Sequence, residues 1–503
     1  MAVDRRSPRD GGCPLTPPTA VASRRPEVGR SVALREFHAF EAFGARFLYM
    51  VPSAGVFRLD ETGSAILDAL SGGPLEMDAL VEATSHGHDS DHVRDIIDEL
   101  TEIRAIGDPS APKDQVPNDL PPADFPLNTM VLNVTNKCNL ACTYCYEYGE
   151  DKIVDTQYGK QPKFMSEDTA EESVDFLLAE SKGQPVAQLT FFGGETLLNF
   201  PVLQRTVTYA RRRAAEEGKR IEFSLTTNAT LLKPEIIQWL ADNQIGVTIS
   251  IDGPKQVQDG LRVFHNGRGT YDVVLPKIKE LLQVHRSRPI GARVTLTQKH
   301  LNVLEIFRHL TEEVGFWEVG LAPVTTQDHR DYAITPEGKD AMLRQFEELA
   351  HEWLACALRD EHHGFSNVRD TIEEIHKGVS KAYGCGAGLG LMGVATDGNV
   401  SLCHRFAGSP EHTLGSVSEG LDREKQERFL VDHHIASKTD CHTCWARPIC
   451  SGGCYHEAHV RYGDSSHANL HYCTWVRSWT HTCLEIYGAL AEKNPKFLSR
   501  FDA

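Results

Sequence analysis

The stretch that decides this chain is Val134-Thr-Asn-Lys-Cys-Asn-Leu-Ala-Cys-Thr-Tyr-Cys-Tyr146, which carries Cys138, Cys142 and Cys145 in the spacing Cys-x3-Cys-x2-Cys. An iron-sulfur cubane has four irons, so three thiolates would leave one iron without a protein ligand. An iron with an open position can bind and activate a small molecule, whereas a fully ligated cluster only passes electrons. A zinc knuckle or a chance grouping is the alternative interpretation.

A strand precedes this loop and a glycine motif follows it. The apolar run Met130 to Val134 predicts a strand that leads directly into the loop. The cysteines would then lie at the carboxyl end of a strand, where α/β barrels build their active sites. Further along, the run from Leu189 predicts a buried strand that ends in Gly193, Gly194 and Glu195. Glycines let backbone approach a ligand closely, and strand-end carbonyls with a carboxylate can bind an ammonium group.

The two motifs together resemble the radical S-adenosylmethionine (SAM) superfamily, with Tyr144 as the aromatic residue before the third cysteine. The resemblance implies that the open iron chelates the amine and carboxylate of SAM. One electron then cleaves the sulfonium to a 5′-deoxyadenosyl radical, which abstracts hydrogen from the substrate. It also implies SAM contacts from Thr226, Asn228 and Ser250, although Ser or Thr at a strand end is more often a turn or a helix cap.

Strand-like and helix-like stretches alternate through the middle of the chain. Strands are predicted at 222–226, 246–251, 293–296 and 319–324, with helices such as 201–217 and 233–242 between them. Such alternation predicts a parallel sheet with right-handed crossovers. The expected fold class is α/β, with a partial (β/α)6 radical SAM barrel over residues 129–335.

A second constellation of cysteines lies in the last third of the chain, in the spacing Cys-x12-Gly-x4-Cys, then Cys-x2-Cys-x5-Cys-x3-Cys, then Cys. It resembles the SPASM domain of peptide and protein maturases, which implies two auxiliary clusters and therefore three 4Fe-4S clusters in all. A zinc ribbon is the alternative, but these cysteines do not divide into tetrahedral sites of four. The residues are Cys385, Cys403, Cys441, Cys444, Cys450, Cys454 and Cys473.

The resemblance divides these cysteines between an outer and an inner cluster. It implies that the inner cluster is held by Cys385, Cys403 and Cys454, and is one ligand short. Cys356, another side chain or a substrate cysteine remain alternatives for the missing ligand. The outer cluster takes the other four residues, Cys441, Cys444, Cys450 and Cys473.

His404 directly follows Cys403. Sulfatase-type maturases tend to carry an acidic residue at this position, where it serves as the base. The run Cys-His-x-Phe-x-Gly resembles thioether-forming peptide maturases instead. His404 is therefore a candidate proton acceptor, with a structural hydrogen bonder as the alternative.

Residues 31–108 are expected to form a separate module. Residues 47–51 and 54–59 predict a hairpin, and helices follow, for example over 92–103. This resembles the winged-helix peptide-recognition domain of ribosomal-peptide maturases, which binds a leader peptide as an added strand. A DNA-binding winged helix is the alternative, which the acidic content disfavours. The other expected parts are a disordered tail (1–30), a linker (109–128), a helical bridge (336–384), a SPASM auxiliary-cluster domain (385–485) and a C-terminal tail (486–503).

Composition limits the class of partner. A net charge of −18 argues against nucleic acid, because a phosphate footprint needs a basic face. No apolar run is long enough to span a membrane, and residues 1–30 lack the apolar core of a secretory signal. Thirteen cysteines without an export signal favour metal or cluster binding over disulfides, and a cytoplasmic location.

These resemblances favour a radical SAM peptide maturase. Within that group the chain looks most similar to the maturase of quinohemoprotein amine dehydrogenase, which implies Cys-to-Asp/Glu thioether crosslinks in a small protein or peptide substrate. The implied electron source is a reductant such as flavodoxin or ferredoxin. A sulfatase-type formylglycine maturase is the first alternative. A non-catalytic iron-sulfur electron carrier or peptide chaperone is the second, although neither needs an open iron or the Gly-Gly-Glu strand.

Overall fold

The computed structural model describes residues 31–85, 89–111, 119–156, 159 and 161–502. The predicted tail (1–30) and part of the predicted linker lie outside the described residues. The chain forms two compact units. Of the described residues, one unit contains 31–37, 58–85 and 89–111, and the other contains 38–57, 119–156, 159 and 161–502.

The smaller unit combines a short sheet with helices. Asp60 begins the first helix, because its carboxylate accepts a hydrogen bond from the Gly63 amide at 2.6 Å. Apolar residues at helical spacing, including Ile66 and Ile97, are buried. The central strand β1 pairs antiparallel with both neighbours. The elements are β1 (Ser31–Leu34), β5 (Leu75–Glu76), β6 (Ile106–Gly107), α1 (Glu61–Leu70), α2 (Met77–Thr84) and α3 (Ser90–Glu102).

The structure divides the predicted 31–108 module. Its hairpin joins a further strand in a three-stranded sheet, most of which belongs to the larger unit. The reason is the apolar face of that sheet: Phe40 and Phe47 are buried beside Gly488, where an added Cβ would lie 3.2 Å from each ring. The sequence pattern identified the hairpin but not the surface that it covers. The strands are β2 (Phe37–Ala42), β3 (Ala45–Met50) and β4 (Val56–Arg58).

The larger unit is built on a ten-stranded sheet in the order β12-β11-β10-β9-β8-β7-β13-β14-β15-β16. The first six strands in this order run parallel, each paired with its neighbour in sequence. The predicted alternation of strands and helices is confirmed, with bounds shifted by a few residues. The parallel strands are β7 (Thr129–Asn133), β8 (Val186–Phe192), β9 (Arg220–Thr227), β10 (Gly246–Ser250), β11 (Ile290–Leu296) and β12 (Glu318–Pro323).

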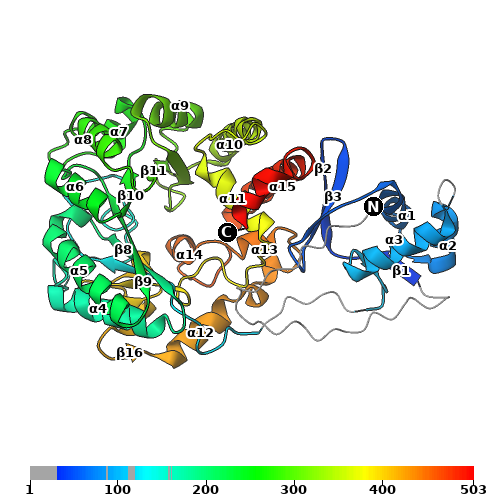
Figure 1. The fold of residues 1–503 in the computed structure, drawn as a ribbon, viewed down its shortest axis with the longest axis horizontal. Helices are drawn as coiled ribbons and strands as arrows, with labels where there is room; N and C mark the ends of the chain where they lie inside the picture. The colour runs from blue at the N-terminus through cyan, green and yellow to red at the C-terminus, as the bar shows by residue number, and fades with distance from the viewer. Residues whose placement is uncertain (1–30, 86–88, 112–118, 157–158, 160, 503) are drawn as a thin grey trace. The chain divides into compact units, whose positions relative to one another are not determined.

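Helices cover one face of this parallel sheet, as Figure 1 shows for α4–α8. In β9 the buried residues alternate, and Phe223 points toward the helices, with the Arg211 guanidinium of α5 5.8 Å from its ring. The intervening Thr226 therefore points to the opposite face, toward the site described below. The helices are α4 (Glu167–Glu180), α5 (Phe200–Glu216), α6 (Pro234–Asp242), α7 (Lys255–Leu261), α8 (Tyr271–Val284) and α9 (Val303–Arg308).

The last third of the chain extends the sheet and adds helices. β13 pairs parallel with β7, and β14–β16 continue antiparallel. The strands are β13 (Leu391–Val394), β14 (Asn399–Ser401), β15 (Thr413–Ser416) and β16 (Gly420–Leu421). The helices are α10 (Pro336–Ala357), α11 (Ser366–His376), α12 (Arg423–His433), α13 (Arg447–Cys450), α14 (Tyr455–Tyr462), α15 (Cys473–Lys493) and α16 (Pro495–Leu498).

The structure differs from the expected C-terminal tail. The expected boundary after residue 485 falls inside α15, and the segment beyond it is folded. The Phe497 ring packs edge-on against Trp353 of α10, with ring centroids 5.4 Å apart. Apolar residues spaced along 486–501 supply this packing, so the helical bridge and the C-terminal segment form one helical layer.

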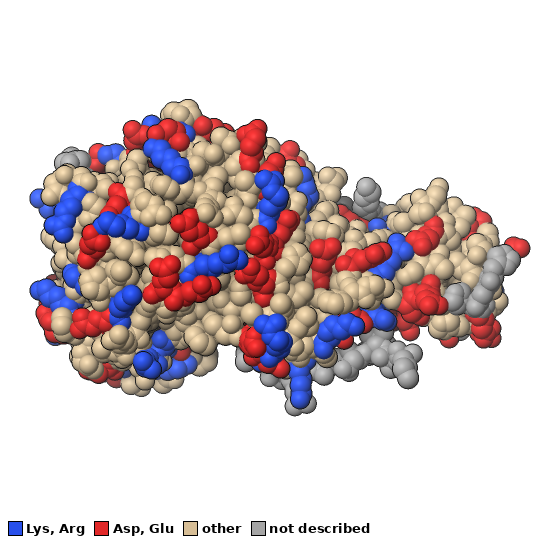
Figure 2. All heavy atoms as spheres, turned by 90° about the horizontal axis from the view of Figure 1, so that it is seen from above, with Lys and Arg blue, Asp and Glu red and all other residues tan. Residues whose placement is uncertain are grey.

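Charge is distributed in a mixed pattern on the surface. On the face shown in Figure 2, Lys and Arg side chains stand among Asp and Glu side chains over both units. Among the described residues, we find no helix that is long and apolar enough to cross a membrane.

Candidate active site

A cavity of about 1020 Å³ lies at the carboxyl ends of the parallel strands. It receives side chains from the loop after β7 and from the ends of β8, β9, β10, β11 and β12, as expected for an α/β active site. The predicted residues that it brings together are Cys138, Cys142, Tyr144, Cys145, Gly193, Gly194, Thr226, Asn228, Ser250 and His404.

The two glycines allow the β8 loop to lie against the cysteine loop. A Cβ at Gly193, which has φ +110°, would lie 2.5 Å from the Thr135 carbonyl oxygen, and one at Gly194 would lie 2.2 Å from that of Lys137. The Gly194 amide donates to the Thr135 carbonyl at 3.1 Å. These glycines therefore serve a close approach between two backbone segments, in addition to lining the cavity.

Glu195 is the one predicted SAM-binding residue that does not line the cavity. Its carboxylate is 1% exposed and accepts hydrogen bonds from the Thr227 hydroxyl at 2.6 Å and from the amides of Asn228 and Leu197 at 2.8 and 3.1 Å. Burial raises the pKa of this carboxyl group. In this structure Glu195 fixes the turn after β9, a role that the motif alone did not indicate.

Tyr144 is held by a buried ion pair that the sequence did not reveal. Its hydroxyl donates to Asp252 at 2.5 Å, and the Arg262 guanidinium donates to the same carboxylate at 2.9 Å while lying 5.4 Å from the Tyr144 ring. The Asp252 side chain is fully buried. Asp252 follows Ser250 at the end of β10, which was the available signal, whereas nothing in the sequence pointed to Arg262.

The other predicted SAM contacts lie at the ends of β9 and β10. Asn228 donates from Nδ2 to Asn139 at 3.0 Å and lies 3.9 Å from the Cys138 sulfur. Thr226 and Ser250 line the cavity wall from neighbouring strands. Because both hydroxyl-bearing residues face the cavity, their placement favours contact with a ligand over a role as a turn or helix cap.

The thiols of the loop fit a cluster of the iron-sulfur kind. Burial raises the pKa of Cys142, and it raises that of Cys145 to about 12. Neutral thiols in an apolar wall lose their protons when they bind iron, because a metal stabilises the thiolate. Three converging thiols, and a cavity at the upper end of the usual range for ligand sites, leave room for a cluster and a nucleotide-sized ligand.

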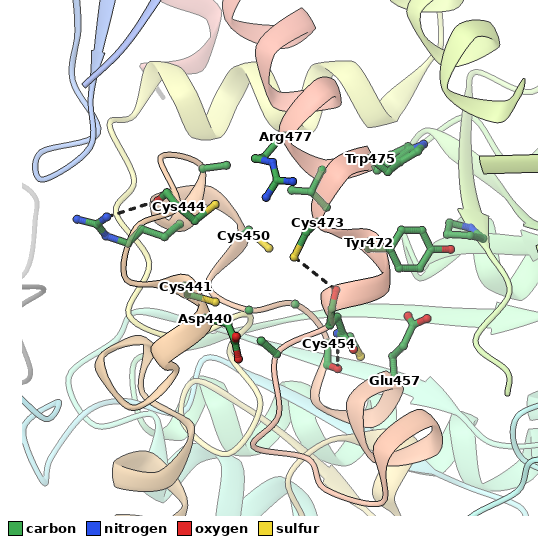
Figure 3. A pocket seen from close by; sticks show the side chains of 18 residues that line it. Asp440, Cys441, Cys444, Cys450, Cys454, Glu457, Tyr472, Cys473, Trp475 and Arg477 are labelled. Carbon is green, nitrogen blue, oxygen red and sulfur yellow. Dashed lines mark hydrogen bonds between the residues drawn. The ribbon is translucent and has the colours of Figure 1, made fainter. Parts of the chain in front are cut away.

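A second cavity of about 220 Å³ collects the predicted outer set of cysteines. Figure 3 shows the sulfur atoms of Cys441, Cys444, Cys450 and Cys473 pointing toward its centre, while Cys454 lies at its edge. Four converging thiols match the ligand number of a 4Fe-4S cluster.

The predicted inner set also comes together. Burial raises the pKa of Cys403 to about 12, and the thiols of Cys385 and Cys454 contribute to the shift. Arg405 lies near the same thiols, stacks 4.7 Å above Tyr146 and donates to Thr325 at 3.1 Å. We see no fourth cysteine beside these three among the described residues.

The two remaining described cysteines lie outside these groups. Cys356 on α10 accepts a contact from the Arg359 guanidinium at 3.8 Å, and Cys483 is fully buried in α15. Neither lines the two cavities. The structure therefore gives Cys356 no place among the inner thiols.

His404 faces the large cavity between aromatic rings. Its ring lies 4.5 Å from that of Phe192, and burial lowers its pKa to about 3. Its Nδ1 is buried and has no partner among the described residues. Glu147, which sequence reasoning missed although it lies two residues after Cys145, also lines the cavity, and burial raises its pKa to about 7.

Comparisons with known proteins agree with this architecture. Residues 132–297 match the Radical SAM superfamily. The chain is 27% identical over 350 residues to a serine-type anaerobic sulfatase-maturating enzyme from Bacteroides thetaiotaomicron, covering 65% of this chain and 82% of the relative. It is 25% identical over 342 residues to a cysteine-type anaerobic sulfatase-maturating enzyme from Clostridium perfringens, covering 65% and 89%.

A solved structure, "Native anSMEcpe with bound AdoMet and Cp18Cys peptide", shares the fold with a TM-score of 0.59 and 20% identity, over 75% of this chain and 99% of that chain. These relatives match the formylglycine alternative better than the quinohemoprotein amine dehydrogenase maturase, for which the comparisons give no support. The matched segment contains the three-cysteine loop, the Gly-Gly turn, four of the six parallel strands (β8–β11) in full and the last two residues of β7. The chain is a radical SAM superfamily enzyme.

Proposed function

We propose that this enzyme is a maturase that modifies a side chain of a peptide or protein segment. The observation that carries the proposal is the convergence of three separate thiol groups in one chain, one of them in a cavity of about 1020 Å³. The inner and outer cysteine groups resemble auxiliary-cluster sites, and the relatives are maturating enzymes. Both points support a peptide substrate over a small metabolite.

Cys138, Cys142 and Cys145 would hold the 4Fe-4S cluster that binds SAM, and the seven later cysteines would hold two auxiliary clusters in a SPASM-type domain. When bound, this cluster and SAM supply a radical that abstracts hydrogen from carbon. The chain itself supplies the surroundings: Gly193 and Gly194 keep the loop close to β8, and hydroxyl groups at the ends of β9 and β10 can orient the ligand.

The modification best supported by the relatives is oxidation of a cysteine or serine to formylglycine. That chemistry needs a proton acceptor near the substrate hydroxyl or thiol. His404 presents an unpartnered Nδ1, and Glu147 presents a carboxyl group, in the same cavity. Glu147, whose pKa burial raises to about 7, is the stronger proton acceptor of the two, because burial lowers the pKa of His404 to about 3.

A thioether crosslink between a cysteine and an Asp or Glu side chain is the second candidate. It is favoured by one observation: a histidine stands after Cys403 where sulfatase-type maturases tend to carry an acid. The three-thiol inner site also leaves room for a cysteine of the substrate as a ligand, which would hold its sulfur as a thiolate.

We also propose that the N-terminal unit, a winged-helix-like module, binds the substrate as a strand added to an edge of its β5-β1-β6 sheet. The reductant would be a flavodoxin or ferredoxin in the cytoplasm, where thiols stay reduced. Hydrogen exchange tests the docking mode, because an added strand protects the edge amides of β5 or β6. Protection confined to residues 129–335 would contradict it.

The decisive experiment is anaerobic turnover by the reduced, iron-reconstituted chain with two peptides. One carries a sulfatase-type cysteine, and the other carries a cysteine and several acidic residues. Both should be tested by mass spectrometry and with a hydrazide that traps aldehydes. Formylglycine exchanges sulfur for an aldehyde oxygen and reacts with the hydrazide, whereas a thioether loses only hydrogen and does not react. Release of 5′-deoxyadenosine with no change in any peptide would contradict the maturase proposal.

A further inference from the structure

Three possible metal ligands meet outside the cysteine groups. They are Glu411 and His412, in a short 3-10 turn (Pro410–His412), and His459 on α14. One ligand atom of each lies within 4.8 Å of the ligand atoms of the other two. Glu411 is exposed, so its carboxylate can move toward the two rings, which lie edge-to-face with centroids 4.8 Å apart.

The His412 ring is fixed in one orientation. Its Nδ1 hydrogen-bonds the Ser409 hydroxyl at 2.8 Å, and its face stacks on Phe406 with centroids 4.1 Å apart. Nε2 is therefore the nitrogen left for a ligand, and a hydrogen bond at the other ring nitrogen is the usual support of a metal-binding histidine.

Of the two neighbouring histidines, His433 has both ring nitrogens engaged in hydrogen bonds. His433 hydrogen-bonds the Ser465 hydroxyl at 2.9 Å through Nε2 and the Phe429 carbonyl at 2.8 Å through Nδ1. His456 lies edge-on to Phe406 and Tyr146, and both of its ring nitrogens are buried without a partner among the described residues. The three side chains whose ligand atoms lie within 4.8 Å of one another supply two imidazoles and one carboxylate, which leaves a tetrahedral ion one further position.

The cluster lies where two segments of the inner cysteine group meet. The His412 carbonyl accepts a hydrogen bond from the Leu402 amide, next to Cys403, at 3.2 Å. His459 lies in the helix that begins directly after Cys454. An ion at this point would tie the turn that follows Cys403 to the helix that follows Cys454.

We propose that Glu411, His412 and His459 bind one zinc ion, which clamps the two chain segments that carry Cys403 and Cys454. Zinc suits the set because it takes imidazole and carboxylate ligands, needs no fixed ligand-field geometry and accepts tetrahedral coordination. An ion bound to ligands from both segments would stabilise the relative position of the two cysteines. The proposal does not depend on which side chain the enzyme modifies.

The test uses the full chain with its iron sites filled, incubated with zinc and passed through a desalting column. We expect about one zinc per chain, and less than about a fifth of that in His459→Asn and in Glu411→Gln, with unchanged iron. His351→Asn is the matched control, because His351 is an exposed helical histidine whose Nδ1 contacts its own helix. It should keep the zinc.

Zinc absorption spectroscopy separates this site from a cysteine site that has lost iron. Only nitrogen and oxygen neighbours at about 2.0–2.2 Å are expected, whereas a cysteine site gives sulfur at about 2.3 Å. Sulfur neighbours, a zinc-free wild type after zinc treatment, or zinc retained by both His459→Asn and Glu411→Gln would each overturn the proposal. If His459→Asn and Glu411→Gln contained less iron than the parent chain, the assignment of this site to zinc would be overturned.

Discussion

The cysteine loop after β7 and the cysteines of residues 385–473 differ in what holds them in place. The loop is held by the barrel: the Gly-Gly turn lies against it, and a buried ion pair holds Tyr144. The outer cysteines lie in short turns, with left-handed backbone at Ser451, Gly452 and Gly453 and few strands around them. The first site is therefore preformed by protein contacts, whereas we expect the second to depend on iron for its order.

Removing the thiols of each site sharpens this contrast most strongly. The triple variant Cys138→Ala/Cys142→Ala/Cys145→Ala should lose about four of about twelve irons and all release of 5′-deoxyadenosine. Cys450→Ala should lose iron from the outer site and still cleave SAM, because its cavity is separate. Iron analysis and chromatographic detection of 5′-deoxyadenosine measure both outcomes. Cleavage that survives in the triple variant would contradict the assignment of the loop.

Iron removal should then affect the two sites unequally. In the iron-free chain we expect amides of residues 438–473 to exchange about 100-fold or more faster than in the loaded chain, because their backbone hydrogen bonds lie in turns and short helices that open readily without the metal. Amides in β7–β11 should change little. Hydrogen exchange followed by mass spectrometry gives the comparison by segment. Equal protection of both regions after chelation would mean that the auxiliary region is also preformed.

Sequence reasoning reached the cysteine groups because their ligands are close in the chain or match a fixed spacing. The parallel sheet followed from alternating patterns, since period-two and helical runs report local structure. The role of Glu195 was missed because its partners, Thr227 and Asn228, come from another strand. The hairpin around Phe47 was assigned to the wrong unit because a strand pattern does not say which surface it will cover.

A third test breaks the ion pair that fixes the loop. Arg262→Met leaves the Asp252 carboxylate buried with only neutral hydrogen-bond donors, from Tyr144 and the Thr295 amide. Removing one partner of a buried pair costs about 3–5 kcal/mol of unfolding free energy. Urea unfolding measures the loss. Arg205→Met is the control, since Arg205 is exposed and its ion pair with Glu171 is screened by water, so this variant should unfold at nearly the same urea concentration as the parent. Equal effects would mean that the pair does not hold the loop.

The smallest expected effect comes from a single methyl group in the turn after β8. Gly194→Ala places Cβ 2.2 Å from the backbone oxygen of Lys137, which cannot move without shifting the cysteine loop. We expect a loss of about 1–3 kcal/mol in unfolding free energy, the usual cost of overpacking, together with slower SAM cleavage.

Gly183→Ala is the matched control, because an added Cβ there meets no atom within 4 Å. Its stability should stay within about 0.5 kcal/mol of the parent. Because Gly194 is outside the left-handed region, a loss confined to Gly194→Ala reports crowding rather than backbone strain. If Gly194→Ala kept both stability and SAM cleavage, the loop would be able to move away from β8, and the contrast between a preformed site and an iron-dependent one would weaken.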